Sequence, residues 1–270
     1  MYELQYSKPS SIDSAVAELG KAKDGKFLAG GMTLIPTLKA RLSSPDVLID
    51  LNGANLSNIK VTGSEVEIGA MTRHSDVASS SEIKTSIPSL AKLAGGIGDH
   101  MVRNCGTIGG SIANNDPAAC YPSAVLALNA KITTNERSIS ASDYFTGMFE
   151  TCLNSNEIIT KVTFSIPDKS SYIKFPNPAS RYAMVGVFMA KNGNDIRVAV
   201  TGAGENGVFR STEIESVLNS NCTLEALENL EISHEGLLSD IHASDKYRAC
   251  LLYTSPSPRD PHLSRMPSSA

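Results

Sequence analysis

The segment that most constrains this chain runs from Cys105 to Ala119 and reads CGTIGGSIANNDPAA. It combines glycines with the hydroxyls of Thr107 and Ser111 and a polar Asn-Asn-Asp-Pro run, and it has little side-chain bulk. Because glycine has no Cβ, the backbone N–H groups of such a segment can come within hydrogen-bond reach of an anion. The segment therefore indicates an anion-binding loop.

A second stretch from Phe27 to Ile35, FLAGGMTLI, has the same character. Its Gly30-Gly31 pair lies between a predicted buried strand and a predicted helix that Thr33 can cap. A glycine turn at a helix N-terminus favours a phosphate, although one such turn is more often only a turn. Two separate glycine turns suit a ligand with two phosphates.

Composition narrows the class of protein. The chain has 270 residues, 41% of them apolar, and a formal charge of −4. This charge gives no reason to expect nucleic acid or an anionic membrane as a partner. No apolar run approaches the length of a membrane span, and no basic-then-apolar stretch opens the sequence. We therefore expect a cytoplasmic protein without a membrane span.

The cysteines and histidines carry no metal-binding signature. Five cysteines without a C-x-x-C argue against a disulfide framework and against a four-cysteine iron–sulfur or zinc site, and favour free thiols in a reducing compartment. The five histidines form no H-x-x-H pattern, so each is interpreted as a surface or hydrogen-bonded residue. Arg103 and Lys174 are either partners for a ligand anion or solvated charges.

Apolar periodicity predicts an α+β fold in three parts. Residues 1–55 give a parallel β-α-β-α-β unit with strands at 2–6, 27–29 and 47–51 and helices at 12–19 and 34–42. Residues 56–168 give an antiparallel-sheet subdomain with strands at 66–70 and 158–166 and a hairpin at 131–140. Its expected helices span residues 74–79, 88–93 and 122–129. Together these subdomains form one expected domain, residues 1–168.

A polar stretch at residues 168–171 is interpreted as a hinge and domain boundary. Beyond it, residues 169–252 predict a small C-terminal domain with strands at 183–191 and 196–201 and helices at 212–218, 224–230 and from 244. Residues 253–270 are rich in proline and serine and resemble translated adapter or vector sequence, so we expect a disordered tail. The G-x-G-x-x-G at 202–207 follows one arm of a hairpin, which favours a plain loop over a dinucleotide fingerprint.

Four pieces of the chain resemble one known family. They are LAGGMTL at 28–34, VRNCGTIGGS at 102–111, DPAA at 116–119 and SDKYR at 244–248. Together they resemble the FAD-binding (medium) subunit of molybdenum hydroxylases, a family that includes carbon monoxide dehydrogenase and xanthine dehydrogenase-like enzymes. The resemblance covers residues 2–251. It implies a vanillyl-alcohol-oxidase-like FAD fold with two subdomains and a C-terminal domain.

The resemblance also assigns cofactor contacts. It implies that two segments grip the FAD pyrophosphate from two sides, namely Ala29, Gly30, Gly31, Met32 and Thr33 in the first and Thr107, Ile108, Gly109, Gly110 and Ser111 in the second. Ile97 and Tyr182 match positions near the isoalloxazine ring, and Ile158 and Lys174 match further flavin contacts. Cys120 stands where the family usually has an aspartate that contacts FAD. Losing a charged contact of this kind weakens binding by roughly 1.5–3 kcal/mol.

The function implied is electron transfer. In the family, FAD passes electrons from the two [2Fe–2S] clusters of a small subunit to an external acceptor, and a large molybdopterin subunit completes a heterotrimer that dimerises. The flavin does the chemistry, so no catalytic residue is assigned. Two alternatives remain: a self-contained FAD oxidase, for which the segment after Pro167 is short, and a module that has lost its flavin. The substrate of the complex and its final acceptor stay open.

Overall fold

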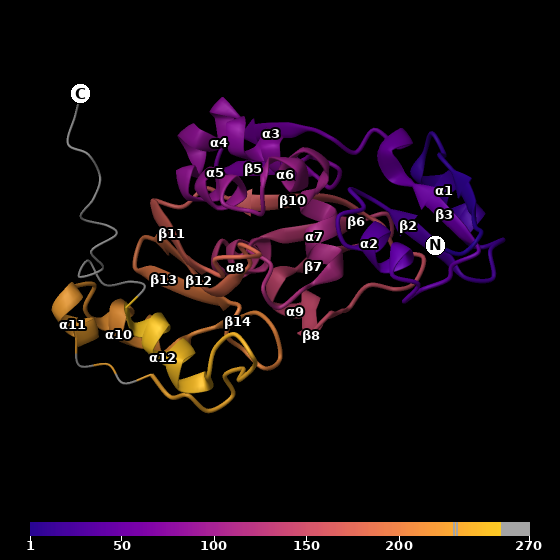
Figure 1. The fold of residues 1–270 in the computed structure, drawn as a ribbon. Coiled ribbons are helices and arrows are strands. Elements are labelled where there is room, and N and C mark those ends of the chain that lie inside the picture. Colours follow the sequence, from indigo (N-terminus) through magenta and orange to yellow (C-terminus); the bar gives the residue numbers. More distant parts are fainter. Residues whose placement is uncertain (229, 231, 255–270) are drawn as a thin grey trace, which may run out of the picture.

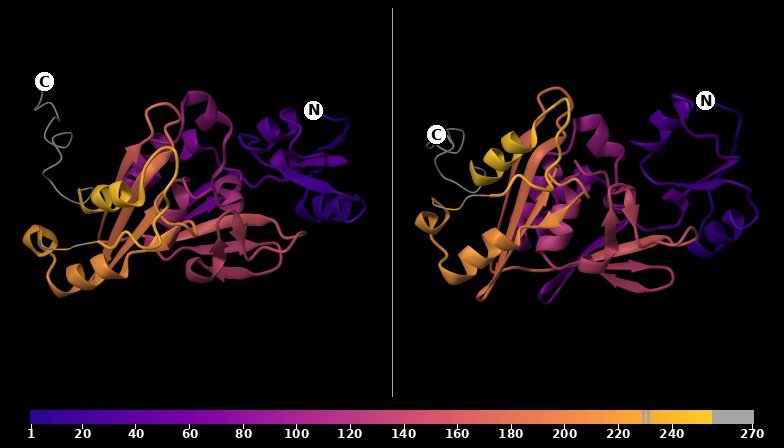
Figure 2. Two further views of the ribbon diagram at one scale, coloured as in Figure 1. Left: turned by 60° about the horizontal axis from the view of Figure 1, so that its bottom comes forward. Right: turned by 90° about the horizontal axis from the view of Figure 1, so that it is seen from below.

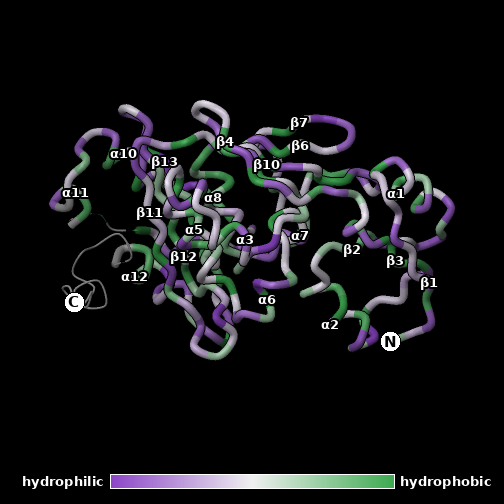
Figure 3. The backbone as a smooth tube through the Cα atoms, turned by 90° about the horizontal axis from the view of Figure 1, so that it is seen from above, coloured by the Kyte–Doolittle hydropathy of each residue, from purple (hydrophilic) through white to green (hydrophobic). Residues whose placement is uncertain are grey.

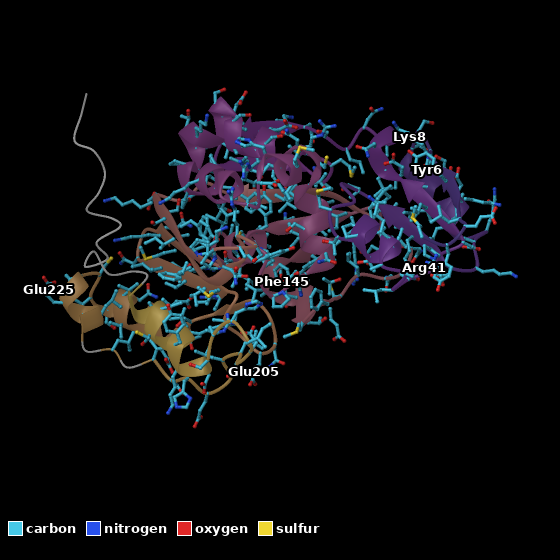
Figure 4. All side chains as sticks on the ribbon, in the orientation of Figure 1. Tyr6, Lys8, Arg41, Phe145, Glu205 and Glu225 are labelled. Carbon is cyan, nitrogen blue, oxygen red and sulfur yellow. The ribbon has the colours of Figure 1, made fainter. Side chains whose placement is uncertain are left out.

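The computed structural model describes residues 1–228, 230 and 232–254, and it arranges them as three units in a row (Figure 1). The N-terminal unit is a parallel sheet in the order β1-β3-β2. Its elements are β1 (Gln5–Ser7), α1 (Ile12–Leu19), β2 (Gly25–Leu28), α2 (Leu34–Lys39), β3 (Val47–Asp50) and the 3-10 turn η1 (Leu51–Gly53). The Tyr6 hydroxyl donates to Asp50 at 2.6 Å and joins the neighbouring strands β1 and β3 (Tyr6 is labelled in Figure 4).

The middle unit is built on a five-stranded antiparallel sheet in the order β4-β5-β10-β6-β7. Its strands are β4 (Ile59–Thr62), β5 (Glu65–Gly69), β6 (Lys131–Thr134), β7 (Ser138–Ser140) and β10 (Ile159–Ser165), and β8 (Phe145–Gly147) pairs separately with β9 (Glu150–Thr151). Its helices are α3 (His74–Ser79), α4 (Ser81–Ser86), α5 (Pro88–Gly95), α6 (His100–Cys105), α7 (Ile108–Asn114), α8 (Tyr121–Ala127) and α9 (Ala141–Tyr144).

The C-terminal unit is a four-stranded antiparallel sheet with helices on both faces. Its elements are β11 (Lys169–Pro176), β12 (Ala183–Asn192), β13 (Asp195–Thr201), β14 (Phe209–Arg210), α10 (Thr212–Ser220), α11 (Leu224–Glu228) and α12 (Asp245–Thr254). Helices α5 and α8 of the middle unit pack on one face, while α10 and α12 pack on the same sheet from outside. Both views of Figure 2 place α10 and α12 at the end of the molecule remote from the N-terminal unit.

One hydrophobic core joins the middle and C-terminal units. It contains Phe164 of the middle sheet, Leu90 and Tyr121 of the helices, and Tyr172 and Phe188 of the C-terminal sheet. In Figure 3 the hydrophobic stretches of these elements crowd together in the middle of the molecule. The N-terminal unit has a smaller core of its own, which also takes in Met71 and Ile158 from the middle unit. The N-terminal unit is therefore docked against the middle unit.

This architecture confirms the predicted α+β fold class, with its parallel unit, its antiparallel subdomain and its C-terminal sheet and helices. The expectation of one long loop at 105–119 is wrong, because residues 108–114 form α7. Thr107 caps this helix by accepting the Gly110 N–H at 3.1 Å. Glycine suits the helix because a Cβ on Gly109 would lie 2.6 Å from the Ala70 Cβ. Close packing on Ala70, the residue after β5, thus offsets the helix cost of glycine, which is about 1 kcal/mol.

Other differences concern short or polar elements. Strand β1 begins at Gln5 rather than Tyr2, and β4, α4, α6 and β11 have no counterpart among the predicted elements. Most of the expected hinge at residues 168–171 is strand instead, because β11 begins at Lys169, which pairs with Lys191 of β12. The motif at 202–207 leads into the antiparallel strand β14, so it is a loop. Of the expected tail, residues 253–254 belong to α12 and residues 255–270 lie outside the described part.

None of the helices in the described part of the chain combines the length and the apolar character that a membrane crossing requires.

Candidate functional site

A cavity of about 670 Å³ lies where the N-terminal and middle units meet. This volume is in the range of pockets for sizeable organic ligands. The cavity is lined by 13 of the 14 residues that the sequence indicates as cofactor contacts, namely Ala29, Gly30, Gly31, Met32, Thr33, Ile97, Thr107, Gly109, Gly110, Ser111, Cys120, Ile158 and Lys174. Segments far apart in the chain therefore share one site.

Ile108 is the exception among these residues. Its side chain is fully buried in the hydrophobic core and does not line the cavity. Tyr182 does line it, with 49% of its surface exposed. Asn115, from the polar run after the glycines, turns inward instead. Its amide donates to the carbonyls of Gly147 and Glu150 at 2.8 Å each, so this side chain binds the β8–β9 hairpin instead of facing the cavity.

The first glycine segment supplies free hydrogen-bond donors. It connects β2 to α2, and Gly31 has a φ of +71°, a conformation that favours glycine. Within the described residues, the backbone N–H groups from Gly30 to Leu34 donate to no protein acceptor, and the Thr33 side chain makes no capping bond. Consecutive free N–H groups at a helix start are suited to binding a phosphate.

The second glycine segment works differently, because its N–H groups are already used. Ile108 donates to the Thr72 carbonyl at 3.1 Å, and Gly109 donates to the Ala70 carbonyl at 2.8 Å. Gly110 donates to the Thr107 hydroxyl. What this segment offers a ligand is a surface without side chains at Gly109 and Gly110, together with the Ser111 hydroxyl, which makes no hydrogen bond within the described part of the chain.

The two glycine segments touch each other. A Cβ added to Gly30 would lie 2.2 Å from the Cys105 carbonyl oxygen and 2.7 Å from the Gly106 Cα. A Cβ on Gly110 would lie 3.2 Å from the Ala29 Cβ. Only glycine permits this approach of one backbone to another. The segments therefore border a single cleft.

The opposite wall of the cavity is held by two cations bound to backbone. The Lys174 ammonium donates to the carbonyls of Gly96 and Arg181, and it lies 3.7 Å from the Cys120 sulfur. The Arg103 guanidinium donates to the carbonyls of Ile97 and Gly98, at 2.9 Å each. Neither side chain is merely a solvated charge, because each is hydrogen-bonded to backbone carbonyls of residues beside the cavity.

Four titratable groups of the cavity have shifted pKa values, and for Tyr182 burial raises the pKa. Burial raises the pKa of Asp116, although the Ala118 N–H that bonds its carboxylate acts in the opposite direction. Hydrogen bonds from Arg137 lead the effects that lower the pKa of Glu157 to about 2. Burial, helped by the positive charge of Arg103, lowers the pKa of His74 to about 4.

His74 is the site residue that sequence reasoning missed. It opens α3, it is 5% exposed, and it lines the cavity, whereas the sequence analysis treated it like the other histidines, as a surface or hydrogen-bonded residue. A spacing motif could not reveal it, because its burial results from the approach of Gly106 and Tyr121 from distant parts of the chain.

Acid should destabilise the FAD-free chain through His74. At pH 7.5 the imidazole is neutral in both states, but below pH 6.5 the unfolded chain binds a proton that the folded chain excludes down to about pH 4. The free energy of unfolding should thus fall by about 2 kcal/mol at pH 5. Urea titrations of wild type and His74→Asn at both pH values isolate this effect, since both proteins share all other groups. An equal loss in the two proteins would contradict it.

No group of three or more His, Cys, Asp or Glu side chains in the described residues is arranged to hold a metal ion. Cys105, Cys120, Cys152 and Cys222 are free thiols.

Comparison with known proteins matches this geometry to a family. Residues 2–168 match the family model described as the FAD binding domain in molybdopterin dehydrogenase. The chain is 38% identical to the glyceraldehyde dehydrogenase medium chain of Sulfolobus acidocaldarius, over 79% of this chain and 80% of that protein. It is 33% identical to the nicotine 6-hydroxylase medium subunit of Paenarthrobacter nicotinovorans, over 91% and 92%.

The fold of this chain also matches solved structures. Carbon monoxide dehydrogenase from Hydrogenophaga pseudoflava, in a form lacking the Mo-pyranopterin moiety, superimposes with a TM-score of 0.83 and 31% identity over 94% of each chain. The chain therefore belongs to the family of FAD-binding medium subunits of molybdenum hydroxylases, and it is an FAD-dependent oxidoreductase subunit.

Proposed function

We propose that this chain is the electron-transfer subunit of its complex. In this proposal, it takes electrons from the [2Fe–2S] clusters of a small partner subunit and passes them to an external acceptor, while a large molybdopterin subunit oxidises the substrate. The relatives support the assembly by their names, since they are medium chains and subunits of dehydrogenases and hydroxylases. We further propose a dimer of such heterotrimers in the cytoplasm, with no nucleic acid as partner.

The lining of the cavity is the main support for this proposal, because its backbone N–H donors suit the two phosphates of FAD. Two phosphates need several N–H donors and close approach of backbone, and the segment from Gly30 to Leu34 offers free N–H groups opposite the bare surface of Gly109 and Gly110. A flat, largely apolar ring system needs apolar walls, which Ile97, Ile158 and Tyr182 supply.

The protein's own residues would bind and orient the cofactor. The glycine segments would hold the phosphates, while Lys174 and Arg103 keep the wall beside Ile97 and Cys120 in place through their bonds to backbone carbonyls. FAD, when bound, supplies the capacity to accept and release electrons. Asp116 also lines the cavity, and burial raises the pKa of its carboxyl group.

A spectroscopic experiment tests the proposal. The purified full chain should be yellow, with absorbance near 450 nm, and a reduced [2Fe–2S] protein mixed with it anaerobically should bleach that band. An added oxidised acceptor dye should restore it. Turnover of an alcohol or amine by the chain alone would point instead to a self-contained oxidase. A colourless protein that takes up no added FAD would point to a module that has lost its flavin.

Replacing Cys120 with aspartate should tighten FAD binding. Cys120 is 5% exposed and its thiol is a weak hydrogen-bonding group, whereas a carboxylate there would pair with Lys174, whose ammonium lies 3.7 Å from the sulfur. A gain of roughly 1.5–3 kcal/mol corresponds to at least a tenfold lower Kd. Quenching of flavin fluorescence measures the Kd, and Cys120→Ser is the matched uncharged control. A Cys120→Asp protein that bound FAD no better than Cys120→Ser would refute the expectation.

A further inference from the structure

The ring of His74 has unused hydrogen-bonding capacity inside the cavity. Its Nδ1 atom is buried and has no partner, and neither ring nitrogen is hydrogen-bonded to protein within the described residues. A ligand in the cavity could not reach Nδ1, because this atom is buried away from the cavity surface. It could reach Nε2, which is not among the buried unpaired atoms and lies beside Gly106 in the lining of the cavity.

The surroundings fix the ring beside the glycine segments. The His74 N–H donates to the Gly106 carbonyl at 2.9 Å, and a Cβ on Gly106 would lie 2.6 Å from the His74 Nε2. Tyr121 packs against the ring with a centroid distance of 5.3 Å. Gly106 in turn abuts Gly30, so the imidazole stands close to the point where the two segments meet.

The protonation state suits a ligand contact. With a pKa lowered to about 4 by burial and by Arg103, the imidazole is neutral at physiological pH. A neutral imidazole has one donor and one acceptor nitrogen. It can therefore bond to a nucleotide hydroxyl or phosphate without placing a second cation near Arg103.

We propose that His74 is a cofactor-binding residue, and that its ring forms a hydrogen bond with the bound flavin nucleotide. This inference rests on the proposed FAD site of the preceding subsection. It assigns to His74 a role in addition to that of the glycine segments. In this role the imidazole is paired only when the cofactor is present.

Three substitutions test the contact by FAD titration of the full chain. His74→Phe keeps a buried ring but removes both nitrogens, and its Kd for FAD should rise about tenfold. His74→Gln places a polar amide near the position of Nε2, and its Kd should stay within about threefold of wild type. The control is His100→Phe, an exposed histidine on the neighbouring helix α6, whose Kd should not change. An unchanged Kd in His74→Phe would overturn the proposal.

A second measurement is made on the wild-type protein and uses one variant only to assign a signal. In ¹⁵N-histidine-labelled wild type, the ring resonance that is missing from His74→Gln should shift when FAD is added, since a new hydrogen bond changes the nitrogen's environment. A residue with a purely structural role would keep its resonance, and that result would also overturn the proposal. If wild type bound no FAD at all, the FAD site itself would be refuted, which is a distinguishable outcome.

Discussion

The Gly30→Ala protein should purify colourless and bind added FAD about a hundredfold more weakly than wild type. The new methyl group would lie 2.2 Å from the Cys105 carbonyl oxygen and 2.7 Å from the Gly106 Cα. Both neighbours are backbone atoms, so no side-chain rotation can relieve the overlap. The two segments must move apart, and this displaces the free N–H groups of the first from the bare surface of the second.

The matched control for this result is Gly95→Ala. Gly95 is in helix α5, and a Cβ there would meet only the Ala78 Cβ, at the ordinary contact distance of 3.8 Å. This variant should retain FAD as wild type does and should be slightly more stable, because alanine favours helix. The ratio of absorbance at 450 nm to that at 280 nm reports FAD occupancy. A fully flavin-loaded Gly30→Ala protein would show that the contact between the segments does not shape the site.

Sequence reasoning pointed to residues that line one cavity, because glycine and hydroxyl residues mark part of it locally. A strand ending at Gly30-Gly31 and a helix beginning after Thr33 follow from periodicity and turn chemistry, and the structure has both. The resemblance supplied Ile97, Ile158 and Lys174, which come from separate parts of the chain and line the same cavity. No local pattern could have joined these three residues.

The sequence could not show which backbone N–H groups are already hydrogen-bonded within the protein and which are free for a ligand. From the residues alone both glycine segments look like donors of free N–H groups, but only the first has them free. The N–H groups of Ile108 and Gly109 bond to the carbonyls of Thr72 and Ala70, just after β5, and this long-range contact has no local signal in the sequence. Burial of His74 has the same origin. Both the hydrogen bonding of these N–H groups and the burial of His74 depend on contacts between segments that are distant in the sequence, and tertiary packing determines those contacts.

The C-terminal unit also reaches the site, through a chain of hydrogen bonds that begins at Arg248 in α12. Its buried guanidinium, 2% exposed, donates to the carbonyls of Met184 and Gly202 and to both carboxylate oxygens of Asp240. The Gly202 N–H in turn donates to the Pro117 carbonyl at 2.7 Å.

Thr201 makes the second connection, because its hydroxyl donates to the carbonyls of Pro117 and Ala119 at 2.9 and 2.6 Å. Asp116, Ala118, Ala119 and Cys120 line the cavity. The position of this wall of the cavity is thus tied to helix α12, although Arg248 itself lies outside the cavity.

Replacing Arg248 with leucine should therefore lower the free energy of unfolding by about 3–5 kcal/mol, because it leaves buried carbonyls and a carboxylate without their cation. The control Arg197→Leu removes a guanidinium whose partner, Asp195, has 55% of its side chain exposed, and it should cost less than about 1 kcal/mol. Urea unfolding measures both values. Similar losses in the two variants would mean that Arg248 is no more important than a surface ion pair.

Thr201→Val separates the effect on the cavity from the effect on stability, since valine keeps the shape and loses only the hydroxyl. If the wall from Asp116 to Cys120 depends on this connection, the variant should bind FAD about three- to tenfold more weakly while α12 and its Arg248 contacts stay in place. Arg248→Leu should then show both defects, weak FAD binding and low stability. An Arg248→Leu protein that unfolds easily but binds FAD normally below its unfolding transition would restrict Arg248 to holding the C-terminal unit together.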